Sequence, residues 1–261
     1  MKMARILITG TRGGIGLDAA RRLLSLGHTV YATVHKEDAV KPLRESLAVF
    51  GALAIVEKLD VLEAKDRQKV VKWNIDILIN NAAIGNSGPL AEIPLEKVSE
   101  VFETNVIASI AMAQECIPYM KEQGRGKIIF MSSLAGLIPT YYLAPYGMSK
   151  YAIENVGLSL RQELKPFGID VSLINPGGYH TGFNQKNFSK MQEWFDKEGL
   201  YKEHLDKVLI AEKAISTFEQ KSTASIAKKI VKAVKAKKMK RRYSAPGYQW
   251  FFVSLFKRFL V

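Results

Sequence analysis

Cysteine is nearly absent from this sequence, because Cys116 is the only one among 261 residues. A single cysteine cannot form an intramolecular disulfide, which agrees with a reducing compartment. The four histidines lack the spacing of zinc ligands, so we expect no metal site. No apolar run approaches the roughly 18 residues that cross a bilayer, and the N-terminus has no secretory leader. These absences predict a cytoplasmic protein.

Acidic residues are missing from the end of the chain. From Gln220 onward there are twelve lysines and arginines and no aspartate or glutamate. Because the whole chain has a net charge of +13, the first 219 residues carry only +1. We therefore expect a nearly neutral globular body with a basic tail.

What the sequence does contain is an alternation of short apolar segments with amphipathic ones. Strands are expected over 4–10, 28–34, 53–61, 75–83, 126–133 and 169–178, and helices over 16–27, 95–123 and 146–166. Nearly continuous apolar strands between helices are typical of a parallel sheet covered on both faces. The sequence predicts one α/β domain over residues 1–261, with a doubly wound parallel sheet (a Rossmann fold) and ligands beyond the carboxyl ends of its strands.

The segment TGTRGGIG (9–16) occupies the first predicted turn between a strand and a helix. Gly10, Gly14 and Gly16 allow a sharp turn and a close approach of a ligand to the backbone. The free N–H groups at the start of the following helix favour a pyrophosphate. This context makes the glycines more informative than an isolated glycine cluster.

Tyr146 and Lys150 lie four residues apart, on one face of the helix predicted over 146–166. Most such pairs are a surface tyrosine beside a solvated lysine. The alternative is a proton-transfer pair, in which the ammonium group favours the phenolate and lowers the pKa of the tyrosine from its usual value near 10. Other parts of the sequence must decide between the two.

Several motifs, in this order, resemble the short-chain dehydrogenase/reductase family. They are TGxxxGIG at 9–16, LDV at 59–61, NNAA at 80–83, Asn105, Ser133 in SSLAG, Tyr146 with Lys150, and NPGGYHT at 175–181. Ser133 precedes Tyr146 by thirteen residues, the usual distance in that family. Ala83 replaces the family's glycine in NNAG, a change from one small residue to another. The resemblance covers roughly residues 4 to 182, so these motifs together favour the proton-transfer interpretation.

The resemblance implies roles for individual residues. Tyr146 would be the acid/base, Lys150 its electrostatic partner and a ligand of the nicotinamide ribose, and Ser133 a hydrogen-bond donor to the substrate oxygen. Asn105 would help to hold a water chain from the lysine. The expected cofactor-binding residues are Gly10, Arg12, Gly14, Ile15, Gly16, His35, Lys36, Asp60, Val61, Asn81, Ala82, Tyr146, Lys150, Pro176, Gly177, Tyr179 and Thr181.

The end of the second predicted strand bears on which nicotinamide cofactor binds. Enzymes that favour NAD usually have an acid there, which binds the ribose 2′-hydroxyl. Here that position is Val34, and His35 and Lys36 follow it. Arg12 in the glycine turn adds another cation, so we expect NADP(H) in preference to NAD(H).

Two C-terminal regions extend beyond the cofactor-binding core of about 4–178. Residues 179–223 carry Phe183, Phe188, Met191, Trp194, Phe195 and Leu200 among charges. This content favours a lid over an apolar pocket or, equally, packing onto the sheet. The basic, aromatic tail of about 226–261 has three interpretations. These are packing on the same protein or a second subunit, peripheral contact of 245–261 with an anionic membrane, and nucleic-acid binding, in that order.

The sequence thus predicts an NADP(H)-dependent oxidoreductase that acts on an alcohol/ketone pair, with a sterol-, retinoid- or fatty acyl-like substrate. Alternatives are an NAD(H)-dependent alcohol dehydrogenase with a small polar substrate and a non-catalytic nucleotide-sensing protein. The resemblance also implies a homodimer or homotetramer, formed through the helices near 95–123 and 146–166.

Overall fold

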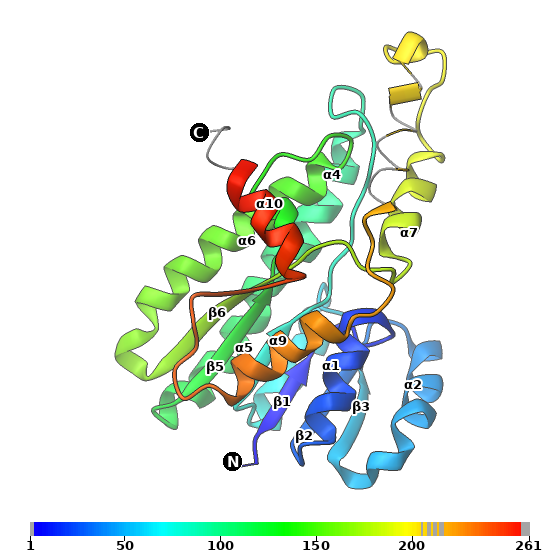
Figure 1. The fold of residues 1–261 in the computed structure, drawn as a ribbon. Coiled ribbons are helices and arrows are strands. Elements are labelled where there is room, and N and C mark those ends of the chain that lie inside the picture. The colour runs from blue at the N-terminus through cyan, green and yellow to red at the C-terminus, as the bar shows by residue number, and fades with distance from the viewer. Residues whose placement is uncertain (1–2, 205, 208–209, 211–212, 214–216, 257–261) are drawn as a thin grey trace.

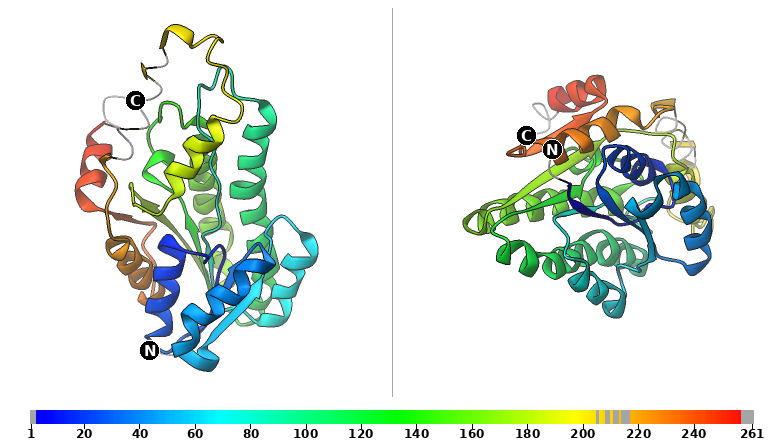
Figure 2. Two further views of the ribbon diagram at one scale, coloured as in Figure 1. Left: turned by 90° about the vertical axis from the view of Figure 1, so that its right-hand side faces the viewer. Right: turned by 90° about the horizontal axis from the view of Figure 1, so that it is seen from below.

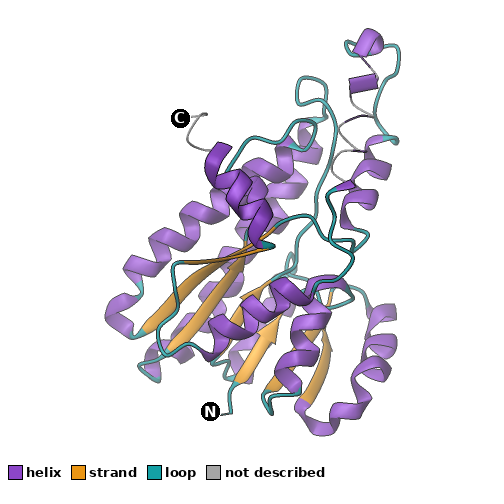
Figure 3. Ribbon diagram, in the orientation of Figure 1, coloured by secondary structure: helices purple, strands orange, loops and turns teal. Residues whose placement is uncertain are grey.

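The computed structural model describes residues 3–204, 206–207, 210, 213 and 217–256. Its described strands form one parallel sheet in the order β3-β2-β1-β4-β5-β6-β7. The strands are β1 (Arg5–Ile8), β2 (Thr29–Val34), β3 (Ala54–Lys58), β4 (Ile77–Asn80), β5 (Gly126–Met131), β6 (Ile169–Pro176) and β7 (Arg242–Ala245). The order reverses between β1 and β4, so the predicted doubly wound sheet is confirmed. Figure 3 shows the strands of this sheet in orange, with helices around them.

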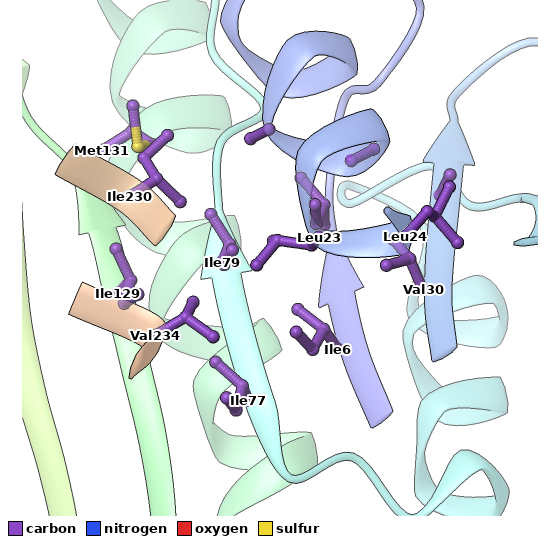
Figure 4. Packing of buried hydrophobic residues seen from close by; sticks show 14 of the residues in the cluster. Ile6, Leu23, Leu24, Val30, Ile77, Ile79, Ile129, Met131, Ile230 and Val234 are labelled. Carbon is purple, nitrogen blue, oxygen red and sulfur yellow. The ribbon is translucent and has the colours of Figure 1, made fainter. Parts of the chain in front are cut away.

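Helices cover both faces of the sheet (Figures 1 and 2). One face carries α1 (Gly14–Leu24), α2 (Val40–Leu47) and α9 (Ala224–Lys235), and the other carries α3 (Ala64–Gln68), α4 (Leu95–Phe102), α5 (Ala108–Glu122) and α6 (Ala144–Glu163). Successive residues of β1 serve different cores, because Ile6 and Ile8 pack with α1 whereas Leu7 packs on the opposite face. Figure 4 shows the first of these cores. Burial on both faces explains why the strands are almost continuously apolar.

The helix that we predicted over 95–123 is interrupted. After α4 the chain forms a π-helical segment, Glu103–Ile107, before α5 begins. Such segments are rare and often lie at functional sites. Thr104, Asn105 and Val106 within it are buried, so this irregular turn faces the protein interior.

The region that we expected to be a basic tail is largely part of the fold, in agreement with the first of its three interpretations, packing on the same protein. The apolar face of α9 is buried through Ile226, Ile230 and Val234, and β7 pairs in parallel with β6. The lysines of α9 lie on its other face, which explains why the segment reads as basic. The chain then forms α10 (Gly247–Phe256) beyond the carboxyl ends of the strands.

The segment predicted as a lid contains α7 (Phe183–Met191) and a 3₁₀ turn at Lys202–His204. Phe188 and Met191 are buried and pack against Tyr142, Trp194 and Phe195. Parts of 205–216, and Lys257 and Arg258 of the tail, lie outside the described residues. Within the described part of the chain, no helix is both long and apolar enough to cross a membrane.

Candidate active site

A cavity of about 1800 Å³ opens at the carboxyl ends of the strands. Its wall includes residues that follow each of the first six strands: Gly10, His35, Asp60, Asn81, Ser133 and Gly177. Parts of α4, α7 and α10 complete the wall. The cavity therefore lies where ligands bind in doubly wound sheets, at the reversal of strand order.

Hydrogen bonds hold the glycine turn against the end of β4. Asn81 Nδ2 donates to the carbonyl oxygens of Thr9 and Gly10, both at 2.9 Å, and Thr9 Oγ1 accepts from the backbone amides of Asn81 and Ala82. Gly10 has a φ of +71°, and a Cβ there would lie 2.9 Å from Ala82 Cα. Asn81 thus positions the turn, a role that the motif alone does not specify.

The geometry of this turn fits a dinucleotide. A Cβ on Gly16 would lie 2.6 Å from Asn81 Nδ2, and a Cβ on Gly14 would lie 3.1 Å from the Cβ of Thr181. The absence of these two side chains makes room for Asn81 and Thr181. Gly14, Ile15 and Gly16 line the cavity in the first turn of α1, where backbone N–H groups lack partners within the helix. The residues present can therefore hold a pyrophosphate at this helix N-terminus.

Ser133, Tyr146 and Lys150 all line this cavity. Ser133 follows β5, its Oγ accepts a 3.1 Å hydrogen bond from the N–H of Ala135, and it lies close enough to Tyr146 to affect the pKa of the phenol. Lys150 is only 3% exposed and donates a 2.8 Å hydrogen bond to the carbonyl oxygen of Met131. Its Nζ lies 5.4 Å from the centroid of the Tyr146 ring. A side chain from the end of β5 and two side chains one turn apart on α6 thus lie on the wall of the same cavity.

Burial dominates the acid–base properties of this pair. It raises the pKa of Tyr146 to about 12, although the nearby hydroxyl group of Ser133 acts in the opposite direction. Burial also lowers the pKa of Lys150 to about 8. We predicted a lowered pKa for the tyrosine, whereas in the chain without cofactor its pKa is raised. The reason is that loss of hydration disfavours the charged form of each group.

Asn105 lies behind the cavity wall rather than on it. In the π-helical segment its side chain donates to the carbonyl oxygen of Ile84 and to Ser149 Oγ, and it accepts from the N–H of Ile84, all at 2.9 Å. These contacts join the segment after β4 to α6. These contacts make Asn105 a positioning residue, and the water-chain role implied by the resemblance stays a prediction.

The predicted residues for the adenosine side are only partly brought together. Arg12, His35, Asp60 and Val61 line the cavity, whereas Lys36 is exposed and does not. Partial burial lowers the pKa of His35, and Asp60 acts in the opposite direction. Three cations lower it further: Lys36, Lys186 and Arg12. Lys186 belongs to α7 and was not among the predicted residues.

The segment after β6 supplies a further part of the wall, through Pro176, Gly177, Tyr179 and Thr181. Tyr179 is only 4% exposed, and its hydroxyl group forms a 2.7 Å hydrogen bond with Ser225 Oγ. Its hydroxyl is therefore engaged by the start of α9. Of the predicted cofactor contacts here, the side chain of Thr181 is the one that lies beside the glycine turn.

Sequence reasoning missed the contribution of α10 to the wall. Gln249, Phe252, Val253 and Phe256 line the cavity with the i, i+3, i+4, i+7 spacing of one helical face. Gln249 Oε1 accepts a 2.9 Å hydrogen bond from the N–H of Gly178, and its Nε2 donates to the carbonyl oxygen of Phe218. The spacing was visible in the sequence, but nothing local indicated which surface the face would cover.

Among the described residues, no group of three or more His, Cys, Asp or Glu side chains could hold a metal ion. On the part of the wall that follows β5, the tyrosine and lysine of α6 lie beside a serine, and the glycine turn lines the same cavity. This arrangement suits proton transfer next to a bound dinucleotide.

Comparisons with known proteins agree with this geometry. The sequence profile of short chain dehydrogenases matches residues 4–192. Human 17-beta-hydroxysteroid dehydrogenase type 1 is 32% identical over 255 residues, which cover 92% of this chain and 77% of the human protein. The NADPH-dependent 3-dehydrocapnine reductase of Ornithobacterium rhinotracheale is 29% identical over 92% of this chain and 87% of its own length. A gluconate 5-dehydrogenase from Burkholderia cenocepacia, solved with NADP and tartrate, matches with a TM-score of 0.67 and 26% identity over 71% of this chain and 75% of its own. The chain belongs to the short-chain dehydrogenase/reductase family of oxidoreductases.

Proposed function

We propose that this protein is an NADP(H)-dependent oxidoreductase that interconverts an alcohol and a ketone on an apolar substrate. The observation that carries the proposal is the convergence of Ser133, Tyr146 and Lys150 on a cavity that also contains the glycine turn. A nicotinamide ring, when bound, supplies or accepts the hydride. The chain must then provide a proton at the substrate oxygen and a site that holds the substrate.

Tyr146 is suited to hold that proton. Because burial raises the pKa of its hydroxyl to about 12, the phenol is protonated at neutral pH and can donate to a carbonyl oxygen. Ser133 lines the same cavity close enough to affect the pKa of Tyr146, and its hydroxyl group can orient the same oxygen. Lys150 has a pKa lowered to about 8 and is still mostly protonated at pH 7, so its charge favours the phenolate left after transfer.

The preference for NADP(H) is supported by the cations near the end of β2. Arg12 and His35 line the cavity, and no acid stands at Val34. The reductase from Ornithobacterium is NADPH-dependent, and the Burkholderia structure contains NADP. A ratio of NADPH to NADH efficiency below one contradicts the preference and favours the NAD(H)-dependent alternative.

An apolar substrate is supported by the part of the wall near Tyr146. The ring of Phe183 lies 5.2 Å from that of Tyr146, and Leu143, Phe252 and Val253 also face the cavity. The human relative is by name a steroid dehydrogenase, so a substrate with a similar apolar body fits this wall. The alternative of a small polar substrate predicts high activity on short hydroxy acids or sugars in the same assay panel.

The decisive experiment replaces Tyr146 with phenylalanine. A panel of steroid, retinoid and long-chain ketones is screened with NADPH consumption as the readout, and the best substrate is used for the variant. Tyr146→Phe should lose at least about a hundredfold in kcat, the usual contribution of a general acid. NADPH binding, measured by fluorescence, should stay within a factor of two. Full activity of the variant would refute the proposed role and leave a different acid to be found.

We also propose that the chain forms a homo-oligomer. Ile107, Met148 and Tyr151 are exposed apolar residues on the π-helical segment and α6, which are the predicted contact surfaces. Double substitution of Met148 and Tyr151 by serine should shift the molecular mass in light scattering toward the monomer. An unchanged mass would place the contact elsewhere.

Peripheral contact with an anionic membrane is the other proposed use of exposed apolar surface. Phe251 and Leu255 on the outer face of α10 are 64% and 43% exposed and do not line the cavity. Phe251→Ser with Leu255→Ser should abolish sedimentation with anionic liposomes while substrate turnover persists. Equal sedimentation of the wild type and the double variant would refute the membrane proposal.

A further inference from the structure

The helix α7, which we call the lid helix, touches separate parts of the cavity. At its first residue, Phe183 lies beside the ring of the catalytic candidate Tyr146. One turn later, Asn187 is 3% exposed and packs so closely on Gly85 that a Cβ there would lie 2.4 Å from Asn187 Nδ2. The lid helix is therefore seated against the wall on the substrate side and follows the cavity from there.

Lys186, also on the lid helix, is at the adenosine side of the same cavity. It lines the wall together with Arg12 and His35, and its charge acts on His35. Among the described residues, neither Arg12, Lys36 nor Lys186 forms an ion pair with a carboxylate. Cations from the glycine turn, the end of β2 and the lid helix thus gather around one histidine without neutralisation by a salt bridge.

Such a group of unpaired cations lowers its free energy by binding an anion. Asp60 lies close enough to affect His35, but one carboxylate does not balance three cations. A phosphate monoester carries close to two negative charges and accepts several charge-assisted hydrogen bonds. The place beside the end of β2 is the one at which these folds hold the adenosine ribose. The anion that suits both the charge and the place is the phosphate of NADP(H) at that ribose.

We propose that Lys186 of the lid helix binds the 2′-phosphate of NADP(H) together with Arg12 and His35. This inference rests on the proposed function, and it adds that the lid that covers the substrate also selects the cofactor. An ammonium group on a long flexible side chain can reach a phosphate from a helix that lines the same cavity. Binding of NADP(H), rather than NAD(H), would then hold the lid helix in place before the substrate enters.

Lys190 provides a matched control. It has the same charge, lies one turn further along the same helix and also lines the cavity, but it does not act on His35. We would compare Lys186→Gln, Lys190→Gln and the wild type by measuring the Kd of NADPH and of NADH for the full chain by fluorescence titration. Thermal unfolding followed by circular dichroism checks that each variant is folded.

Because Lys186→Gln loses one charge-assisted contact, its Kd for NADPH should be about tenfold higher than that of the wild type. NADH binding should stay within a factor of two, and Lys190→Gln should change the ratio of the two constants little. The NADPH effect should shrink at high salt, because the contact is exposed to screening. Equal losses for NADPH and NADH would place Lys186 on a group common to both, such as the pyrophosphate, and would overturn the inference.

Two other outcomes separate the inference from the proposed function. If the wild type binds NADPH and NADH equally well, the proposed NADP(H) preference fails, and the inference fails with it. If the wild type prefers NADPH and Lys186→Gln keeps that preference, the proposed function stands and only the role of the lid lysine is refuted.

Discussion

Replacement of Lys150 by methionine should abolish catalysis and yet stabilise the protein without cofactor at neutral pH. Lys150 is 3% exposed, and burial lowers its pKa from the usual 10.5 to about 8. A tenfold change in proton affinity corresponds to about 1.4 kcal/mol, so keeping the buried ammonium protonated costs the folded state about 3 kcal/mol. Methionine has a similar length and carries no charge to desolvate.

The gain is reduced by the loss of one hydrogen bond. Lys150 Nζ donates to the carbonyl oxygen of Met131 at 2.8 Å, and an unsatisfied buried carbonyl costs about 1 kcal/mol. The free energy of unfolding of Lys150→Met should therefore exceed that of the wild type by about 2 kcal/mol at pH 7. Urea unfolding followed by circular dichroism, without nicotinamide cofactor, measures this difference.

The pH dependence of the difference is the sharper test. Because the folded pKa of Lys150 lies below the unfolded one, the penalty is complete below pH 8 and is relieved as the pH rises from 8 to 10.5. The unfolded chain binds the extra proton in that window, so the wild type gains stability there relative to the variant. The advantage of Lys150→Met should shrink by about 2 kcal/mol between about pH 7 and about pH 9.5. Tyr146 titrates above that range in both states. A difference that is constant with pH, or a variant less stable at pH 7, would refute the reasoning.

Three further substitutions test the glycine turn, an ion pair and the cavity wall. Gly16→Ala should raise the Kd of NADPH at least tenfold and lower the unfolding free energy by about 1–3 kcal/mol, because its Cβ would meet Asn81 Nδ2 at 2.6 Å. Asp66→Asn should lower the free energy of unfolding, measured with urea at neutral pH, by about 1–2 kcal/mol. Burial alone would raise the pKa of Asp66, but hydrogen bonds from Lys58, Lys69 and the Asp60 backbone hold that pKa far below its usual value. Since the folded pKa is depressed, this cost should fade as the pH drops below about 4, and a pH-independent cost would contradict the ion-pair explanation. Phe252→Ala should raise the KM for a long-chain ketone about threefold to tenfold without changing the Kd of NADPH; a parallel change in both would argue against a substrate wall.

The sequence predicted the first six strands to within a few residues, since each is a buried apolar run that ends in a recognisable turn. It did not predict β7, whose four residues RYSA follow a lysine-rich segment and contain only one large apolar side chain. Its burial depends on pairing with β6 far away in the sequence. Local composition carries no information on such a pairing, and the lysines suggested solvent.

The candidate site was predictable to the extent that it depends on backbone turns and on helical spacing. The glycine turn, Ser133 and the Tyr146–Lys150 pair lie together on the cavity wall, because each is fixed by the end of a strand or by one helix. The pKa values were not predictable, because they depend on how much water the folded chain excludes from the pair. The hydrogen bonds of Asn105 to Ile84 and Ser149 were likewise not predictable, because they depend on three segments that only the fold brings together.

The path of the C-terminal residues changes the argument about a membrane. In the sequence, the basic stretch and the aromatic stretch adjoin and together resemble an interfacial helix. In the fold, β7 separates them: the lysines of 235–240 precede its first residue, whereas α10 begins beyond the carboxyl end. Anionic lipids attract basic residues only within about a Debye length of the membrane surface. Those lysines therefore contribute little electrostatic attraction to a membrane contact made through Phe251. What α10 does have is an inner face on the cavity and a hydrogen bond to Gly178 beside the Pro176–Gly177 turn. Phe252 and Phe256 are therefore explained first by the wall of the cavity, and a membrane contact has to rest on the outer face of α10 alone.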